Sequence, residues 1–186
     1  SVLNNYTIFD DGTMTKATLF ATGGTKDKVF YTADGGTSWS KIFDSANYTN
    51  VLVGDAVMDP VNPQKIFIAR KTGSGAIKGG LMISTDAGGT WTEKLSGLIL
   101  QTAEIDPVNN NNVYVGTGLR SGYPTQRQAV YKSTDGGSTF TEITGIPWAT
   151  SGSALKNIPK IEINPLDPNH VVVLADERIA VTRDAG

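Results

Sequence analysis

The stretch Ser84-Thr85-Asp86-Ala87-Gly88-Gly89-Thr90-Trp91 decides the fold, and it reads S-x-D-x-G-x-T-W. Close copies stand at 32–39 and 133–140, and a fourth begins at 182–186. The aspartates of these copies lie about 50 residues apart, and self-similarity at such a period is typical of stacked repeat architectures. The sequence therefore predicts one structural unit that is repeated along the chain.

Each repeat carries strand signals in the same order. In the second repeat the β-rich runs lie at 51–58, 66–69, 81–83 and 90–94. Turn-forming residues separate these runs. No segment has a sustained helical period, so we expect almost no helix. Four short antiparallel strands per repeat predict an all-β fold, a β-propeller built of four-stranded antiparallel blades.

The predicted blades span 1–43, 51–95, 101–144 and 158–186. The last is predicted to be incomplete, because its copy of the repeated stretch breaks off before Thr-Trp. Residues 1–186 thus form one propeller segment of about four blades. We expect this segment to belong to a larger propeller, for example one of about seven blades. The rest would come from residues not included here or from a partner chain, since terminal repeats must be capped or closed.

Composition excludes several kinds of chemistry. The chain has no cysteine, which rules out disulfides and thiolate catalysis, and its one histidine, His170, leaves no pair of histidine metal ligands. We therefore expect no metal site and no cofactor. A net charge of −2 without a basic run indicates no nucleic-acid partner. No apolar run approaches the roughly 18 residues of a membrane-spanning helix.

The aspartate of each repeated stretch is interpreted as a structural residue rather than a calcium ligand or a catalytic acid. An aspartate in a turn accepts hydrogen bonds from the N–H groups that follow it, and a nearby glycine supplies the left-handed backbone. The terminal aromatic residue is expected to pack between blades. A catalytic acid is needed once, not once per repeat. The predicted structural residues are Asp34, Trp39, Asp86, Trp91, Asp135, Phe140 and Asp184.

The repeated stretch resembles the Asp-box, also called the BNR repeat, over essentially the whole chain. The resemblance implies a propeller of the kind found in sialidases, xyloglucan-hydrolysing glycosidases, the sortilin luminal domain and photosystem assembly factors. A D-P-x-N-P turn, as at 59–63, followed by a short strand and the box is most similar to the xyloglucanase group. The resemblance also implies boxes at the outer edge, away from any active site, and an extracellular or cell-surface location.

Strand alternation assigns the loops to two ends of the propeller. The D-P turns and the boxes share one end, and loops of variable length share the other, where binding usually takes place. Exposed aromatic and basic side chains there suit a sugar ring or a protein partner. The candidate ligand-binding residues at this end are Tyr48, Arg120, Tyr123 and Trp148.

Asp55 is the candidate catalytic carboxylate. It is predicted near the propeller axis, and the equivalent positions of the next two repeats hold Thr102 and Lys160. A glycosidase needs two carboxyl groups, and the sequence pairs no second one with Asp55. Whether the chain is an enzyme is therefore left open by the sequence. The arginine-isoleucine-proline motif of sialidases is absent, since Asn157-Ile158-Pro159 lacks the arginine.

Two functional hypotheses follow. The first is an extracellular propeller module that binds a glycan or processes a polysaccharide, xyloglucanase-like, and that would be a glycoside hydrolase if it is an enzyme. The alternative is a non-catalytic scaffold that binds a protein partner or has a structural role. A groove with aromatic side chains and paired carboxylates would favour the first, and an apolar patch without such carboxylates would favour the second.

Overall fold

The computed structural model describes residues 3–10, 16–22, 27–48, 51–72, 79–118, 128–146, 157–176 and 178–186. These residues form antiparallel strands and one short 3-10 helix, Ser45–Asn47. No α-helix occurs among them. The prediction of an all-β chain with almost no helix is therefore confirmed.

The strands form four separate sheets. The first sheet contains β1 (Leu3–Asp10), β2 (Lys16–Thr22), β3 (Lys28–Thr32) and β4 (Ser40–Asp44). The second sheet contains β5 (Val51–Met58), β6 (Ile66–Thr72), β7 (Gly80–Ser84) and β8 (Thr92–Lys94). The third sheet contains β9 (Leu100–Ile105), β10 (Val113–Thr117), β11 (Val130–Ser133) and β12 (Thr141–Glu142). The fourth sheet contains β13 (Lys160–Ile163), β14 (Val171–Ala175) and β15 (Arg178–Thr182).

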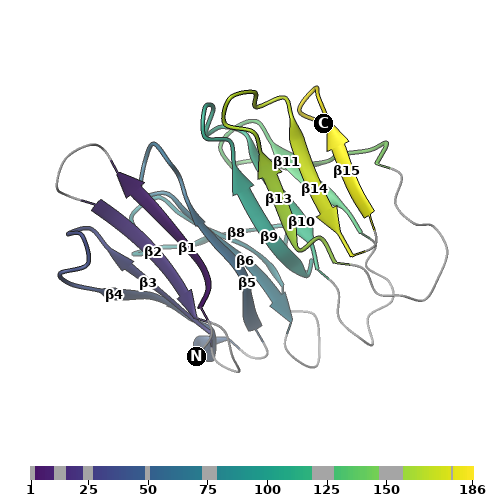
Figure 1. The fold of residues 1–186 in the computed structure, drawn as a ribbon. Helices are drawn as coiled ribbons and strands as arrows, with labels where there is room; N and C mark the ends of the chain where they lie inside the picture. Colours follow the sequence, from purple (N-terminus) through teal and green to yellow (C-terminus); the bar gives the residue numbers. More distant parts are fainter. Residues whose placement is uncertain are drawn as a thin grey trace.

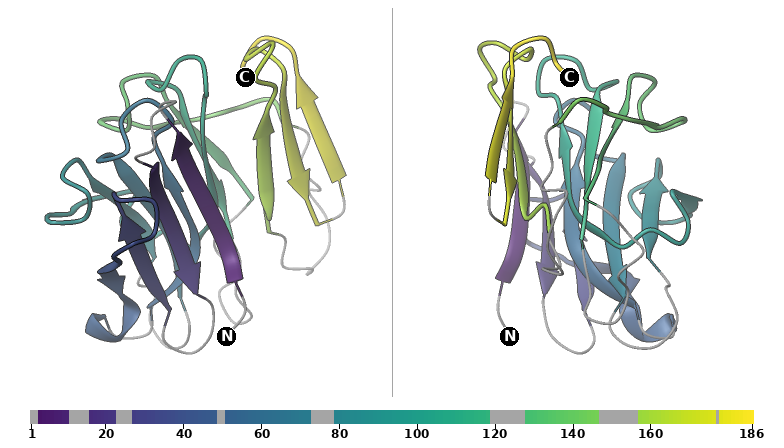
Figure 2. Two further views of the ribbon diagram at one scale, coloured as in Figure 1. Left: turned by 60° about the vertical axis from the view of Figure 1, so that its left-hand side comes forward. Right: turned by 90° about the vertical axis from the view of Figure 1, so that its right-hand side faces the viewer.

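The sheets stack side by side in chain order, as the colours in Figure 1 show from purple to yellow. Within each sheet the strands follow the chain, so the first strand of every sheet is an edge strand. These first strands touch one another, because β5 contacts both β1 and β9, and β13 contacts β9. Figure 2 shows the same stacking from two further directions. This arrangement, antiparallel blades around an axis lined by their first strands, is a β-propeller fold.

Apolar clusters fill the interfaces between consecutive sheets. Val29 and Phe43 of the first sheet pack against Val53 and Ile66 of the second. Similar clusters join the second sheet to the third and the third to the fourth. A blade of this size has too little apolar surface to fold alone, so burial between neighbours is the main stabilising contribution.

The boxes form the turns that follow β3, β7, β11 and β15. In the second sheet, Asp86 Oδ1 accepts hydrogen bonds from the Thr90 N–H and from Ser84 Oγ, each at 2.8 Å. The Thr90 hydroxyl donates to Asp86 Oδ2 at 2.8 Å. The hydrogen bonds from Thr90, together with that from Ser84, hold the pKa of Asp86 below its ordinary value. Asp34 and Asp135 accept the same set of hydrogen bonds in their own turns.

The aromatic residues that end the boxes differ in their environment. Trp91 packs against the cluster between the first two sheets, and Phe140 packs against the cluster between the second and third. Trp39 is instead 46% exposed, although its Nε1 donates to the Gly36 carbonyl at 3.1 Å. Trp91 and Phe140 each pack on the preceding sheet, and since no described sheet precedes the first, the interblade position of Trp39 stays a prediction.

Candidate functional site

Strands β5, β9 and β13 place equivalent residues of three blades next to one another along the axis. The register supports this equivalence, since Asp55, Thr102 and Lys160 lie opposite matching positions of the second strands. Two residues further along these strands, on the same face of each sheet, the equivalent residues are Val57, Glu104 and Glu162. We define the axial cluster as Asp55, Thr102, Glu104, Lys160 and Glu162.

Asp55 links two blades. Its side chain is buried, and its Oδ2 accepts hydrogen bonds from Thr102 Oγ1 at 3.1 Å and from the Ala103 N–H at 3.2 Å. Its Oδ1 accepts from the Ala56 N–H at 2.9 Å. The structure therefore brings together Asp55 and Thr102, with both carboxylate oxygens engaged. These contacts join β5 to β9, whereas a catalytic role for Asp55 stays a prediction.

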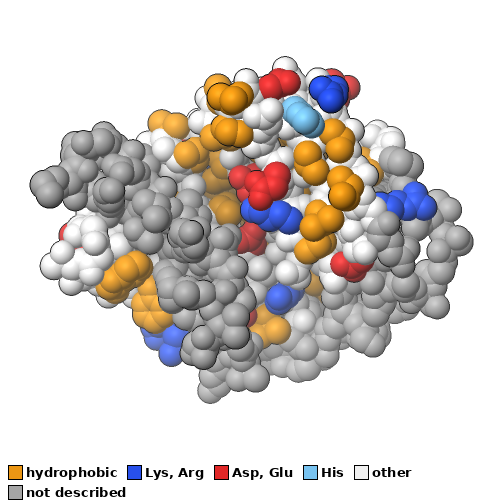
Figure 3. All heavy atoms as spheres, viewed as in Figure 1, with side chains coloured by type: hydrophobic (Ala, Val, Ile, Leu, Met, Phe, Trp, Pro, Cys, Tyr) orange, Lys and Arg blue, Asp and Glu red, His pale blue; other side chains and the backbone are white. Residues whose placement is uncertain are grey.

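Lys160 lies between two glutamates. Its Nζ is 3.3 Å from Glu104 Oε2 and 3.5 Å from Glu162 Oε1. The Glu104 side chain is 24% exposed and that of Glu162 is 64% exposed, so one carboxylate beside Lys160 is partly buried and the other is accessible to solvent. In Figure 3, acidic and basic side chains meet near the middle of the face, over strands β9 and β13.

Glu104 has an unusual protonation equilibrium. Burial raises its pKa to about 7, and the nearby Lys160 ammonium opposes this rise only in part. The pKa of Lys160 lies above its ordinary value, because the two glutamate charges outweigh the opposing effect of burial. A carboxyl group that is half protonated near neutral pH can act as a proton donor or acceptor there.

Tyr48 and Arg70 form a second contact between blades. The Arg70 guanidinium lies over the Tyr48 ring at 5.6 Å, and Tyr48 stacks on Phe43 with ring centroids 5.2 Å apart. Arg70 Nη2 also lies 2.6 Å from Glu93 Oε1 and donates to the Gly79 carbonyl at 3.4 Å. Arg70 is only 3% exposed, whereas the Glu93 side chain is 40% exposed, so only the arginine side of this ion pair is shielded from water.

Gly80 makes room for this ion pair. A Cβ atom at Gly80 would lie 2.9 Å from both Arg70 Nη2 and Glu93 Oε1. The guanidinium therefore crosses β7 where that strand has no side chain. The Tyr48 ring is already in contact with Phe43 and Arg70, and its predicted role in ligand binding stays a prediction.

The other predicted ligand-binding residues, Arg120, Tyr123 and Trp148, lie outside the described residues. Sequence reasoning also missed Glu104 and Glu162. A position-by-position comparison of Val57, Glu104 and Glu162 would have found them, because an apolar residue in one repeat is replaced by an acid in the next two. Among the described residues no group of three or more potential ligands could hold a metal ion, and no helix is long and apolar enough to cross a membrane.

Replacing Asp55 by asparagine is expected to lower the free energy of unfolding by about 2 kcal/mol, because the amide nitrogen cannot accept the hydrogen bonds that reach one of the two side-chain oxygens of Asp55. Urea denaturation measures this loss. Asp167→Asn, in an exposed turn, is the control and should leave stability within about 0.5 kcal/mol. A stable Asp55→Asn protein would show that the link between β5 and β9 contributes little.

Comparisons with known proteins place the fold but not the family. No protein-family model matches the sequence, and neither does any curated protein. Among solved structures, an ancestral GH74 enzyme superposes with a TM-score of 0.71 at 16% identity, covering 99% of this chain and 23% of the other. The GH74 xyloglucanase from Xanthomonas campestris gives 0.69 at 18% identity, covering 98% and 28%. YCF48 bound to D1 peptide gives 0.59 at 17% identity, covering 98% and 51%.

These likenesses agree with the stacked sheets and the axial strands described above. The fold therefore places the chain in the class of β-propeller proteins, and the chain superposes on a part of each of these structures. It spans about a quarter of the length of the two GH74 enzymes and about half that of YCF48.

Proposed function

We propose that this chain is part of an extracellular or cell-surface Asp-box propeller that binds a glycan and takes part in polysaccharide processing. The observation that carries the proposal is the axial cluster, where Glu104, with a pKa of about 7, lies beside Lys160. Support for the Asp-box class comes from the turn hydrogen bonds that recur in three boxes. Support for a glycan comes from the shared fold with GH74 enzymes.

The axial cluster offers the groups that glycoside hydrolysis needs. In this proposal the protonated Glu104 carboxyl donates its proton to the leaving oxygen of the glycosidic bond, and the Lys160 ammonium stabilises the carboxylate that remains. Glu162 is the second carboxylate, because it is the most exposed acid of the cluster. In this proposal it takes a proton from the water whose oxygen bonds to the anomeric carbon as the glycosidic bond breaks. Asp55 suits this role less well, since both of its oxygens already accept hydrogen bonds.

The second candidate function is a protein-binding scaffold. Leu174, Ile179 and Val181 of β14 and β15 are 43%, 68% and 54% exposed. In the second sheet the equivalent residues are buried by the next blade. Apolar side chains are also visible in Figure 3 over β14 and β15. Such a face suits a protein partner, and one fold neighbour, YCF48, is bound to a peptide.

Incubation with a panel of plant and bacterial polysaccharides tests the proposal through two readouts, release of reducing ends and direct binding. Glu104→Gln is expected to reduce release at least about 100-fold while binding is kept, because the amide cannot donate the proton. Glu142→Gln, on the outer strand β12, is the matched control and should retain full activity. If the unmodified protein neither binds nor cleaves any glycan, the proposal fails and the scaffold function is favoured.

A further inference from the structure

A hollow of about 320 Å³ lies between the second and third sheets, and we call it the basic hollow. Both bordering sheets have all four strands. Strand β8, which contributes to its wall, is the outer edge strand of the second sheet, whereas the axial cluster lies on first strands. The hollow is therefore a second surface, separate from the axial cluster. The lining residues that matter for its chemistry are Lys65, Ile83, Thr85, Thr92, Lys94 and Asp135.

Two lysines of the second sheet line the basic hollow. Lys65 stands immediately before β6, and Lys94 ends β8. Both are partly buried, and neither forms an ion pair with any residue that the structure describes. Lys65 Nζ lies over the Phe67 ring, 5.6 Å from its centroid. Two ammonium groups that share a partly covered hollow repel each other, and an anion bound there would offset this repulsion.

Asp135 also lines the basic hollow, but its carboxylate is engaged within its own box. Its Oδ1 accepts hydrogen bonds from Ser133 Oγ at 2.7 Å and from the Thr139 N–H at 2.9 Å, and its Oδ2 accepts from the Thr139 hydroxyl at 2.6 Å. The hydrogen bonds from Thr139, together with that from Ser133, hold the pKa of Asp135 well below its ordinary value. Two lysines and one ionised aspartate leave the hollow with a net positive charge.

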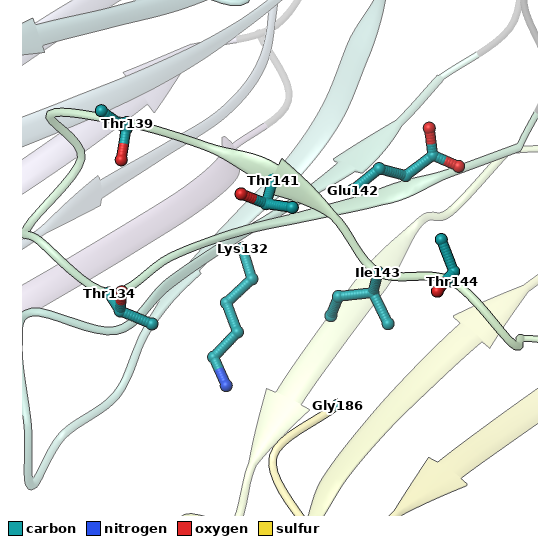
Figure 4. A pocket seen from close by; sticks show the side chains of 8 residues that line it. All are labelled: Lys132, Thr134, Thr139, Thr141, Glu142, Ile143, Thr144 and Gly186. Carbon is teal, nitrogen blue, oxygen red and sulfur yellow. The ribbon is translucent and has the colours of Figure 1, made fainter.

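Lys94 departs from the repeat. Counted from the box aspartate, its position is held by Ile42 in the first repeat and by Ile143 in the third. A Cβ at Gly88 would lie 2.5 Å from Ile42 Cβ, and a Cβ at Gly186 would lie 2.9 Å from Ile143 Cδ1. Figure 4 shows the Ile143 side chain pointing toward Gly186. At these two interfaces an isoleucine thus packs against the box glycine of the next sheet.

The box glycine between the second and third sheets has other neighbours. A Cβ at Gly137 would lie 2.7 Å from Phe67 Cε1 and 3.0 Å from Ile83 Cδ1. Packing of the third box therefore does not depend on position 94, and a lysine there leaves a polar space instead of an apolar contact. Lys65 departs from the repeat as well, since the third repeat has Asn112 at this position. Both changes add positive charge to the same hollow.

We propose that the basic hollow binds an acidic sugar residue of a glycan, whose carboxylate or sulfate group lies against Lys65 and Lys94. Its volume is at the lower end of the range for small-molecule sites. The exposed Thr85 and Thr92 offer hydroxyl groups to the sugar hydroxyls, and Ile83 offers an apolar contact to the ring. This site does not depend on the hydrolysis proposed for the axial cluster.

Calorimetric titration of the chain with trigalacturonate and with a sulfated trisaccharide tests the proposal. Binding of either acidic probe is expected, and the tighter of the two identifies the preferred acidic group. Raising the salt concentration from about 20 mM to about 300 mM should weaken binding, because salt screens exposed charges. Neutral cellotriose and inorganic sulfate should each bind at least about tenfold more weakly than the tighter acidic probe, because each offers only part of the contacts.

Three variants locate the binding site. Lys94→Ile introduces the residue that two other repeats have at this position, and it should weaken binding of the acidic probe at least about tenfold. Lys65→Gln should do the same. Lys71→Gln, on β6 outside the hollow, removes the same charge and is the matched control, so it should change affinity by no more than about twofold.

Equal binding of charged and neutral trisaccharides would overturn the proposal, and so would equal affinities of inorganic sulfate and the acidic probe. Unchanged affinity in Lys94→Ile, or equal losses in Lys94→Ile and Lys71→Gln, would also overturn it. Loss of binding in Glu104→Gln but not in Lys94→Ile would assign the acidic sugar to the axial cluster, which overturns this site and leaves the proposed function standing. Binding that depends on Lys94 in a protein that cleaves no polysaccharide would support this site and contradict the hydrolytic role.

Discussion

Replacing Gly137 by alanine is expected to lower the free energy of unfolding by about 3 kcal/mol, the sum of left-handed backbone strain and overpacking. Gly137 has a φ of +92°, and a Cβ there would lie 2.7 Å from Phe67 Cε1 and 3.0 Å from Ile83 Cδ1. Both neighbours are buried in the second sheet, so neither can move away without opening the interface to the third sheet. Guanidinium denaturation measures the loss.

The adjacent glycine supplies the matched control. Gly136 has a φ of +70°, and the nearest atom to a Cβ there would be Lys65 Nζ, at 2.5 Å, which is the flexible end of a long side chain, while Asn111 Oδ1 would lie at an ordinary contact distance of 3.5 Å. Equivalent positions in two other boxes already hold alanine, Ala87 with φ of 56° and Ala185 with φ of 64°. Gly136→Ala should therefore cost about 1 kcal/mol, the left-handed strain alone. Equal losses for the two variants would show that packing between blades does not restrict this position.

The repeated box is why so much of the fold could be predicted from sequence. Asp34, Asp86 and Asp135 recur with the same neighbours, and a local turn whose hydrogen bonds stay within five residues is specified by its own sequence. The order of the strands follows from the same repetition, because each blade repeats the hairpins of the one before. The box does not specify what packs on it, and the exposure of Trp39 depends on a neighbouring sheet rather than on local sequence.

The axial cluster shows where sequence reasoning stops. Asp55 stood out because it departs from the repeat, but burial and three hydrogen bonds give it a place between blades that no local pattern reveals. The raised pKa of Glu104 arises from burial, and Lys160, which opposes the rise in part, lies in another blade, far along the chain. Contacts of this kind depend on how the blades stack, and a single sequence does not state that geometry.

The stability of the protein is expected to fall by up to about 3 kcal/mol between pH 4.5 and pH 7 through Glu104 alone. An ordinary glutamate has a pKa of about 4.3 in an unfolded chain, whereas burial raises the pKa of Glu104 to about 7 in the fold. Between these values the folded state binds a proton that the unfolded state has lost. The free energy of unfolding therefore decreases as pH rises through this window, and the loss is complete above pH 7.

Glu104→Gln tests this prediction because the amide does not titrate. Its free energy of unfolding should vary less than that of the unmodified protein between pH 5 and pH 8, and it should be the more stable of the two at pH 8. The box aspartates do not obscure the comparison, because hydrogen bonds lower the pKa values of Asp34, Asp86 and Asp135, and their effect appears at lower pH and with the opposite sign. Both proteins share that effect, so it cancels in the difference.

Lys160→Met provides a second test of the same electrostatic arrangement. The ammonium of Lys160 lowers the pKa of Glu104, so its removal should raise that pKa above 7 and move the pH-dependent loss of stability to higher pH. Carbon NMR of the Glu104 carboxyl, followed from pH 4 to pH 9, measures the pKa in both proteins. Parallel stability curves for the unmodified protein and Glu104→Gln would contradict the prediction. An unchanged carboxyl titration in Lys160→Met would show that the pair at 3.3 Å does not couple the two blades.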